Sequence, residues 1–184
     1  MELETERLRL RYWTESDRDD FAALNADPVV MAHFPAPLTR EQSDEMVDRI
    51  EDRFDEHGWG LWAAERKDTG AFIGFIGLNI PGFTAPFLPG VEIGWRLAQE
   101  HWGHGFAPEG AIEVLRYVFA DLGWAEILSW TTVDNLKSQR VMEKIGMTHH
   151  PDEDFDHPNL PPGNPHTPHV LYRITRAQWQ AAAR

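Results

Sequence analysis

The first third of the chain alternates between strand-like and helix-like patterns. Apolar residues alternate with arginines over residues 7–12, which predicts a half-buried opening strand. A first helix should follow, with Thr14 as its N-cap and with Phe21 and Leu24 facing the core. The opening of the chain therefore predicts one strand and one amphipathic helix.

A second helix and a hairpin are predicted next. Thr39 and Gln42 form a T-x-x-Q capping box ahead of apolar residues at helical spacing, and this helix should end near Gly58. Strand-like runs at 61–64 and 71–80 are separated by a Lys-Asp-Thr-Gly turn. This spacing is typical of two antiparallel strands.

The second half repeats a strand-to-helix order. A strand is expected over 91–97, then a glycine-rich turn and a helix buried along 111–122. A further strand over 127–133 precedes a short helix that is capped at Asn135 and closed by Gly146. The expected loops are residues 81–89 and 150–168, and a final strand over 169–174 is followed by a short tail.

Composition narrows the class of protein. The 184 residues are 42% hydrophobic and 26% charged, which fits one folded domain over residues 1–184. The chain has no cysteine, and this excludes disulfides, thiolate metal sites and a cysteine-bound acyl intermediate. There is no signal-like or membrane-spanning apolar run, so a cytoplasmic location is expected.

The formal net charge of -13 disfavours binding to nucleic acid or anionic membranes. A cationic or amine substrate suits an acidic protein better. The alternative is that the acidity serves solubility alone.

The glycine-rich turn is the strongest chemical signal. The strand at 91–97 leads into Trp102-Gly103-His104-Gly105-Phe106-Ala107-Pro108-Glu109, where a helix begins. Unpaired N–H groups and the helix dipole make such a start an anion site, although a lone G-x-G is more often a structural turn. No lysine follows the glycines as in a P-loop, and the Rossmann spacing is absent. Glu109 is better placed to support the helix dipole than to act on substrate.

At two places the sequence resembles GNAT superfamily N-acetyltransferases. The segment from Trp102 to Ala107 resembles the superfamily's CoA pyrophosphate turn, Gln/Arg-x-x-Gly-x-Gly/Ala, with Trp at the first position. Residues 134–147 resemble the Asn-x-x-Ser and Lys-x-Gly-Met pattern of the ribosomal-protein N-terminal acetyltransferase branch. The two matches occur in the family's order, and the resemblance covers most of the chain except 150–168.

The resemblance implies an α+β GNAT fold, with a mixed, mostly antiparallel sheet of about seven strands flanked by helices. Its fourth and fifth strands would splay apart to admit the pantetheine arm of acetyl-CoA, the implied co-substrate, and no metal is implied. A backbone N–H near residues 93–95 would serve as oxyanion donor. The residues assigned to the CoA site are Ile93, Trp95, Trp102, Gly103, His104, Gly105, Phe106, Ala107, Asn135 and Ser138.

Acetyl transfer to an amine needs a base and an acid. The resemblance places Glu92 at a catalytic glutamate position, whereas a glutamate on a strand is otherwise most often solvated. Ser138 resembles a serine proposed to protonate the departing thiolate, or else it satisfies backbone groups at a helix start. Tyr117 and Tyr172 are the alternative acids.

Two further groups have simpler explanations. Histidines and aspartates gather between residues 149 and 169, but their spacing matches no metal motif, which favours a loop or lid. Five aromatic residues could line an acceptor pocket, although aromatics at strand spacing are more often core: Phe34, Trp59, Trp62, Phe83 and Phe87.

The sequence therefore predicts direct acetyl transfer to a primary amine, either on a small molecule or at a protein N-terminus. A non-catalytic acyl-CoA-binding module and the use of another acyl-CoA, such as succinyl-CoA, are the alternatives. The acceptor is not encoded in any recognisable motif, and monomer and homodimer are equally compatible with the sequence.

Overall fold

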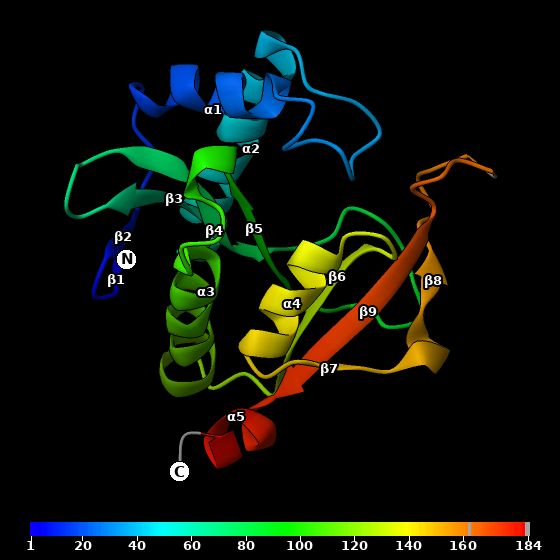
Figure 1. The fold of residues 1–184 in the computed structure, drawn as a ribbon. Coiled ribbons are helices and arrows are strands. Elements are labelled where there is room, and N and C mark those ends of the chain that lie inside the picture. The colour runs from blue at the N-terminus through cyan, green and yellow to red at the C-terminus, as the bar shows by residue number, and fades with distance from the viewer. Residues whose placement is uncertain (162, 183–184) are drawn as a thin grey trace. The chain divides into compact units, whose positions relative to one another are not determined.

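The computed structural model describes residues 1–161 and 163–182 (Figure 1), and the chain divides into two compact units. Unit 1 comprises residues 1–78 and 94–114, and unit 2 comprises residues 79–93 and 115–184. The boundaries fall near the end of one strand and inside another strand and a helix, so these three elements contribute to both units.

Unit 1 contains an antiparallel meander. Its strands are β1 (Leu3–Glu4), β2 (Leu8–Arg11), β3 (Leu61–Arg66), β4 (Phe72–Asn79) and the second half of β5 (Glu92–Leu97). Neighbouring strands from β1 to β4 pair antiparallel. Gly74 lets β4 approach β5 closely, because its φ is 128° and a Cβ there would lie 2.1 Å from the Arg96 carbonyl oxygen.

The helical elements of unit 1 are α1 (Asp17–Ala26), α2 (Arg40–His57), η1 (Gln99–His101) and most of α3 (Phe106–Arg116). The predicted capping box is confirmed, since Thr39 Oγ1 accepts from Gln42 N and Gln42 Oε1 accepts from Thr39 N. The predicted Thr14 cap is wrong. Its hydroxyl donates to the Asp17 carboxylate instead, and Asp17 also binds Arg11.

Unit 2 is built around a long antiparallel pair. Its elements are the first half of β5, η2 (Tyr117–Asp121), β6 (Glu126–Thr132), α4 (Leu136–Lys144), β7 (Thr148–His149), η3 (Pro151–Glu153), β8 (Phe155–Asp156), β9 (Pro168–Thr175) and α5 (Arg176–Ala182). β6 pairs with β9 from Glu126–Thr175 to Thr132–His169, and β7 and β8 both pair with β9. β5 runs parallel to β6 and pairs with it at Glu92 and Leu128.

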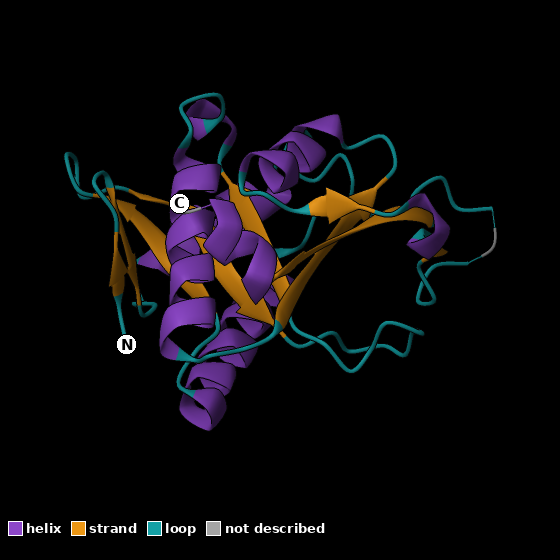
Figure 2. Cartoon of the chain, turned by 90° about the horizontal axis from the view of Figure 1, so that it is seen from below, coloured by secondary structure: helices purple, strands orange, loops and turns teal. Residues whose placement is uncertain are grey.

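The predicted α+β fold with a mostly antiparallel sheet is confirmed (Figure 2). The strands of the described residues number nine rather than about seven, and three of them are only two residues long. The segment 150–168, expected to be loop, contains η3 and β8, and the expected tail contains α5. β8 forms because β9 offers it a partner edge. α5 begins with a local capping box, in which Thr175 N donates to Gln178 Oε1 and Gln178 N donates to Thr175 Oγ1.

The core of each unit is apolar. Among its members are Leu8, Leu10, Phe21, Trp62, Ile73 and Ile76 in unit 1, and Ile93, Leu115, Ile127, Leu128, Met142 and Leu171 in unit 2. Trp62 is fully buried, so its structural interpretation holds. Across the described residues, no helix combines the length and apolarity needed to cross a membrane.

Candidate active site

The predicted phosphate turn of unit 1 has the backbone of an anion-binding loop. Gly103 and Gly105 have φ angles of 79° and 84°, a left-handed conformation that costs glycine little and other residues more. The chain then enters α3, whose first bond runs from Glu109 N to Gly105 O at 3.1 Å. The amides ahead of that bond have no partner within the helix, so this turn can accept phosphate oxygens.

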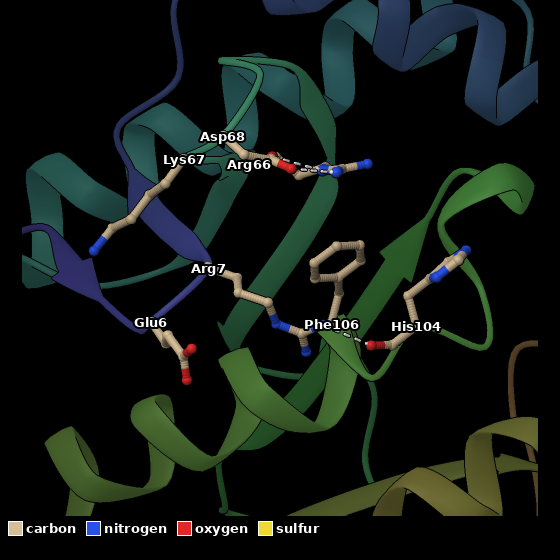
Figure 3. A pocket seen from close by; sticks show the side chains of 7 residues that line it. All are labelled: Glu6, Arg7, Arg66, Lys67, Asp68, His104 and Phe106. Carbon is tan, nitrogen blue, oxygen red and sulfur yellow. Dashed lines mark hydrogen bonds and ion pairs between the residues drawn. The ribbon is translucent and has the colours of Figure 1, made fainter.

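Arg7 and Glu109 brace the turn, and Figure 3 shows the Arg7 side chain beside the His104 carbonyl. Arg7 Nη1 donates to the His104 carbonyl oxygen at 2.9 Å, while Arg7 Nε donates to Glu109 Oε2 at 2.6 Å. Thr5 Oγ1 and Arg7 N both donate to Glu109 Oε1. Glu109 therefore ties the turn to the start of β2, which is more than the dipole support expected of it.

Two guanidinium groups flank Phe106, the first residue of α3. The Arg7 Cζ lies 4.7 Å and the Arg66 Cζ 5.2 Å from the ring centroid, a range in which cation–π attraction operates. A pocket of about 470 Å³ opens beside this sandwich (Figure 3). Its lining is Glu6, Arg7, Arg66, Lys67, Asp68, His104 and Phe106.

The other predicted residues of the turn serve local structure as well. Trp102 Nε1 donates to the Leu97 carbonyl oxygen at 2.8 Å, which pins the turn to the end of β5. The His104 side chain is exposed, and Ala107 lies half-buried in the first turn of α3. Trp95 is half-buried in the part of β5 that belongs to unit 1.

Glu92 lies at the start of β5 in unit 2 and is half-buried. Desolvation raises the pKa of its carboxyl to about 7, against a smaller lowering by a hydrogen bond from the Asn79 amide. That bond joins Asn79 Nδ2 to Glu92 Oε2 at 3.2 Å. A carboxylate that titrates near neutral pH can both accept and release a proton, which a general base requires.

β5 and β6 pair over a short stretch of each strand. Glu92 and Leu128 form their register pair, Leu128 N donates to the Val91 carbonyl oxygen, and the Ser129 hydroxyl donates to the Ile93 carbonyl oxygen at 2.9 Å. Ile93 itself is fully buried. The Ser129 side chain thus contributes a hydrogen bond between β6 and β5 at Ile93.

The helix α4 begins where the resemblance placed the serine acid. Asn135 Oδ1 accepts from Ser138 N at 3.2 Å, and Asn135 Nδ2 donates to Thr131 Oγ1 at 2.9 Å. The capping role thus belongs to Asn135, while the hydroxyl of half-buried Ser138 is not the group that caps the helix. Of the alternative acids, Tyr117 is buried in η2, and the ring of Tyr172 stacks on His149.

An aromatic cluster covers one face of the unit 2 strands. Residues on a strand alternate between faces, so Leu128 and Trp130 share the face of Glu92, which is paired with Leu128. His169 and Phe155, which are register partners, lie on this face too. The cluster consists of Phe83, Phe87, Trp130, Phe155, His157 and His169, all half-buried. Ser129 and Thr131 point to the opposite face, where Asn135 is bound.

In the histidine-rich segment 149–169, His149 contacts two neighbouring side chains. His149 Nε2 lies 2.7 Å from Asp154 Oδ1, and the imidazole stacks on Tyr172. Over residues 1–161 and 163–182, no group of three or more potential ligands is placed to hold a metal ion.

Known proteins resemble this chain in sequence and in fold. The acetyltransferase (GNAT) domain family matches residues 7–148, which is most of the chain. The chain belongs to the GNAT acetyltransferase family. It is 35% identical to the YkkB protein of Bacillus subtilis over 79% of this chain and 84% of that one. It is also 32% identical to the FsC-acetyl coenzyme A-N(2)-transacetylase of Aspergillus fumigatus, over 96% of this chain and 77% of the relative.

Solved structures extend the agreement to the fold. A crystal structure of an acetyltransferase from Agrobacterium tumefaciens aligns with a TM-score of 0.75 at 28% identity, covering 95% of this chain and 94% of its own. A ribosomal-protein-serine acetyltransferase structure from Vibrio cholerae aligns with a TM-score of 0.76 at 12% identity, over 95% of this chain and 97% of its own, which shows the shared fold alone. This GNAT acetyltransferase is thus an acyltransferase of a family that uses acetyl-CoA.

Sequence reasoning missed two residues of this acetyltransferase. The sequence pattern includes Arg7 only as one of the arginines that alternate with apolar residues over 7–12, although Arg7 contacts the turn directly. Asn79 was counted as part of an apolar strand, yet it holds Glu92. A polar amide at the end of an otherwise apolar run was the available signal for Asn79, whereas nothing local distinguishes Arg7 from the neighbouring arginines.

Proposed function

We propose that residues 1–184 act as a single acetyltransferase domain that moves an acetyl group directly from acetyl-CoA to a primary amine. The observation that carries the proposal is Glu92, a desolvated carboxyl with a pKa of about 7 and one amide partner, in a chain of the GNAT family. Because a base works best when its pKa is near the operating pH, Glu92 is poised to accept the proton that the attacking amine loses.

The glycine turn fits the diphosphate of CoA. A Cβ on Gly103 would meet no other atom within 4 Å, so the space in front of this backbone is open to a ligand. The backbone amides of residues 103–107 and the α3 dipole would hold phosphate oxygens, and Arg7 keeps the turn in shape. The assignment of Ile93, Trp95 and Asn135 to the pantetheine arm stays part of the proposal.

Glu92 and Ser138 divide the proton transfers in this mechanism. Bound acetyl-CoA supplies the acetyl carbon that the amine attacks and the thiolate that leaves. Glu92 removes one proton from the amine as the nitrogen–carbon bond forms. The Ser138 hydroxyl delivers a proton to the sulfur as the carbon–sulfur bond breaks, and water restores the hydroxyl proton.

A small amine and a protein N-terminus both satisfy this chemistry. The Aspergillus relative, named an N(2)-transacetylase, supports an amine on a small molecule, whereas the ribosomal-protein branch is supported only by the Asn135–Ser138 pattern and by a shared fold. We favour the small amine for this reason.

Thiol release from acetyl-CoA with a panel of amines tests the proposal. Glu92→Gln should lower kcat/KM about 10²- to 10⁴-fold, because the carboxamide accepts no proton. Stabilisation against heat by acetyl-CoA should persist in this variant, since the turn is intact. The matched control is Glu126→Gln, an exposed carboxylate on β6 paired with Arg173, which should leave the rate unchanged. Unaltered turnover in Glu92→Gln would remove Glu92 from the mechanism.

A further inference from the structure

The aromatic cluster of unit 2 is a surface rather than a closed core. All six rings keep part of their area in solvent, while the true core of the unit is fully buried. The centroids of Phe83 and His157 are 4.7 Å apart, those of Phe87 and Phe155 are 4.8 Å apart, and Phe83 lies 5.6 Å from Trp130. The rings therefore support one another and also present a continuous aromatic face.

The aromatic face lies on the same side of the strands as Glu92, the proposed base. Strand alternation puts Trp130, His169 and Phe155 on the same side of the strands as Glu92. Phe83 and Phe87 come from residues 81–90, the segment that leads directly into β5, and His157 directly follows β8. A Cβ on Gly90 would lie 2.8 Å from Leu128 Cδ1, so this segment lies against the same side of β6. Glu92 and the cluster thus share one surface of one unit.

We infer that the acceptor of this enzyme is a small arylalkylamine, in which an alkyl chain joins a primary amine to an aromatic ring. The aromatic cluster binds this ring beside Glu92. The inference rests on the proposed function, because it names the substrate class of the same site.

The chemistry of the cluster favours an arylalkylamine over a polyamine as the acceptor. Its ring faces can stack on an aromatic ring of the substrate, a contact that a polyamine cannot make. Burial lowers the pKa of His157, with repulsion from His169 adding to the effect, and burial also lowers the pKa of His169. Both shifts favour the neutral imidazole, which repels an incoming ammonium group less than the protonated form does. An aromatic surrounding also stabilises the neutral, nucleophilic form of an amine.

Steady-state thiol release with matched amines tests this inference. Contacts between aromatic rings add to simple burial, so 2-phenylethylamine should exceed hexylamine in kcat/KM by about three- to tenfold, and spermidine and a serine tetrapeptide by more. Trp130→Leu and Phe87→Leu should each bring the ratio of phenylethylamine to hexylamine close to one. Trp179→Leu removes a half-buried ring that contacts Phe119 outside the cluster, and it should keep the ratio.

Calorimetric titration of phenylethylamine into the CoA-saturated protein distinguishes failure of the proposed acetyl transfer from failure of the aromatic ring site. Binding that weakens about tenfold in Trp130→Leu, together with no acetylation of any amine, would refute the proposed function while leaving the ring site standing. A preference for spermidine or for the peptide would overturn the inference and leave the acetyltransferase intact. Equal ratios in wild type and in both folded variants, as judged by circular dichroism, would likewise overturn the inference.

Discussion

Glu109 in unit 1 and Glu92 in unit 2 are both half-buried glutamates beside predicted site residues, yet their environments oppose each other. Glu109 accepts bonds from Thr5 and Arg7, and these outweigh desolvation and lower the pKa of its carboxyl. Glu92 has a single amide partner, so desolvation dominates and raises its pKa to about 7. The comparison teaches that a partner of opposite charge makes a carboxylate structural, while its absence leaves a carboxyl available as a base.

The largest expected effect is the pH dependence of stability that Glu92 causes. Its pKa is raised in the folded protein from the ordinary 4.5 to about 7, so its stabilising contribution is complete below pH 4.5 and is lost as the pH rises through 7. Gln at this position does not titrate. The free energy of unfolding of wild type relative to Glu92→Gln should therefore fall by up to about 3 kcal/mol between pH 4.5 and 8.

Urea unfolding of both proteins across this range measures the difference, with Glu126→Gln as the control that should show no such trend. A difference between wild type and Glu92→Gln that is constant with pH would mean that the Glu92 carboxyl is as well solvated as an exposed one.

Local patterns predicted most of this fold. The capping box at Thr39, the closure near Gly58 and the strand at 91–97 depend on neighbours in the chain, so they could be predicted without tertiary structure. β8 could not, because its strand form depends on pairing with β9. α5, which is expected from the sequence to be a tail, has a local signal in the Thr175–Gln178 capping box. The Thr14 cap failed for a local reason, since Asp17, three residues further on, binds both the Thr14 hydroxyl and Arg11.

The candidate site also has features that local sequence patterns predict and features that they do not. The glycine turn could be predicted because Gly103 and Gly105 carry their own backbone preference. The resemblance singles out Glu92, and its catalytic role stays a prediction; the burial that raises the pKa of its carboxyl comes from tertiary packing, which no local pattern contains. Phe83 and Phe87 were suspected as acceptor contacts, while Trp130 and Phe155 became visible only when the strand registers were known.

A smaller effect is expected when Glu109 is changed. Glu109→Gln removes the charge that holds Arg7, whose side chain is 45% exposed and therefore partly screened by solvent. The unfolding free energy at pH 7 should fall by about 1–2 kcal/mol, and the loss should shrink toward acid pH, where the wild-type carboxyl is also protonated. The KM for acetyl-CoA should rise a few-fold with little change in kcat, because Arg7 supports the turn and does not touch the reacting atoms.

Chemical unfolding and acetyl-CoA saturation curves provide these two readouts. Asp121→Asn breaks an exposed pair with Arg116 and is the matched control, with an expected loss within about 0.5 kcal/mol. A large fall in kcat for Glu109→Gln would erase the contrast between the two glutamates and give Glu109 a part in catalysis.

The smallest expected effect concerns Asn79, whose hydrogen bond moderates the pKa of Glu92. Its amide donates to Glu92 Oε2 and so lowers the carboxyl pKa. Asn79→Leu removes that bond at similar volume, so the pKa of Glu92 should rise. The acidic limb of the kcat profile should move to higher pH by about 0.5 to 1 pH unit, which corresponds to one hydrogen bond of ordinary strength.

The same substitution in the Glu92→Gln background isolates the pair, since a role of Asn79 through Glu92 requires that the pH profile no longer respond. If Asn79→Leu lowered kcat equally at every pH in both backgrounds, its contribution would be to the packing of β4 against β5 and not to the proton acceptor. An unshifted limb in the single variant would show that the amide bond does not govern the titration, and Glu92 would then owe its pKa to desolvation alone.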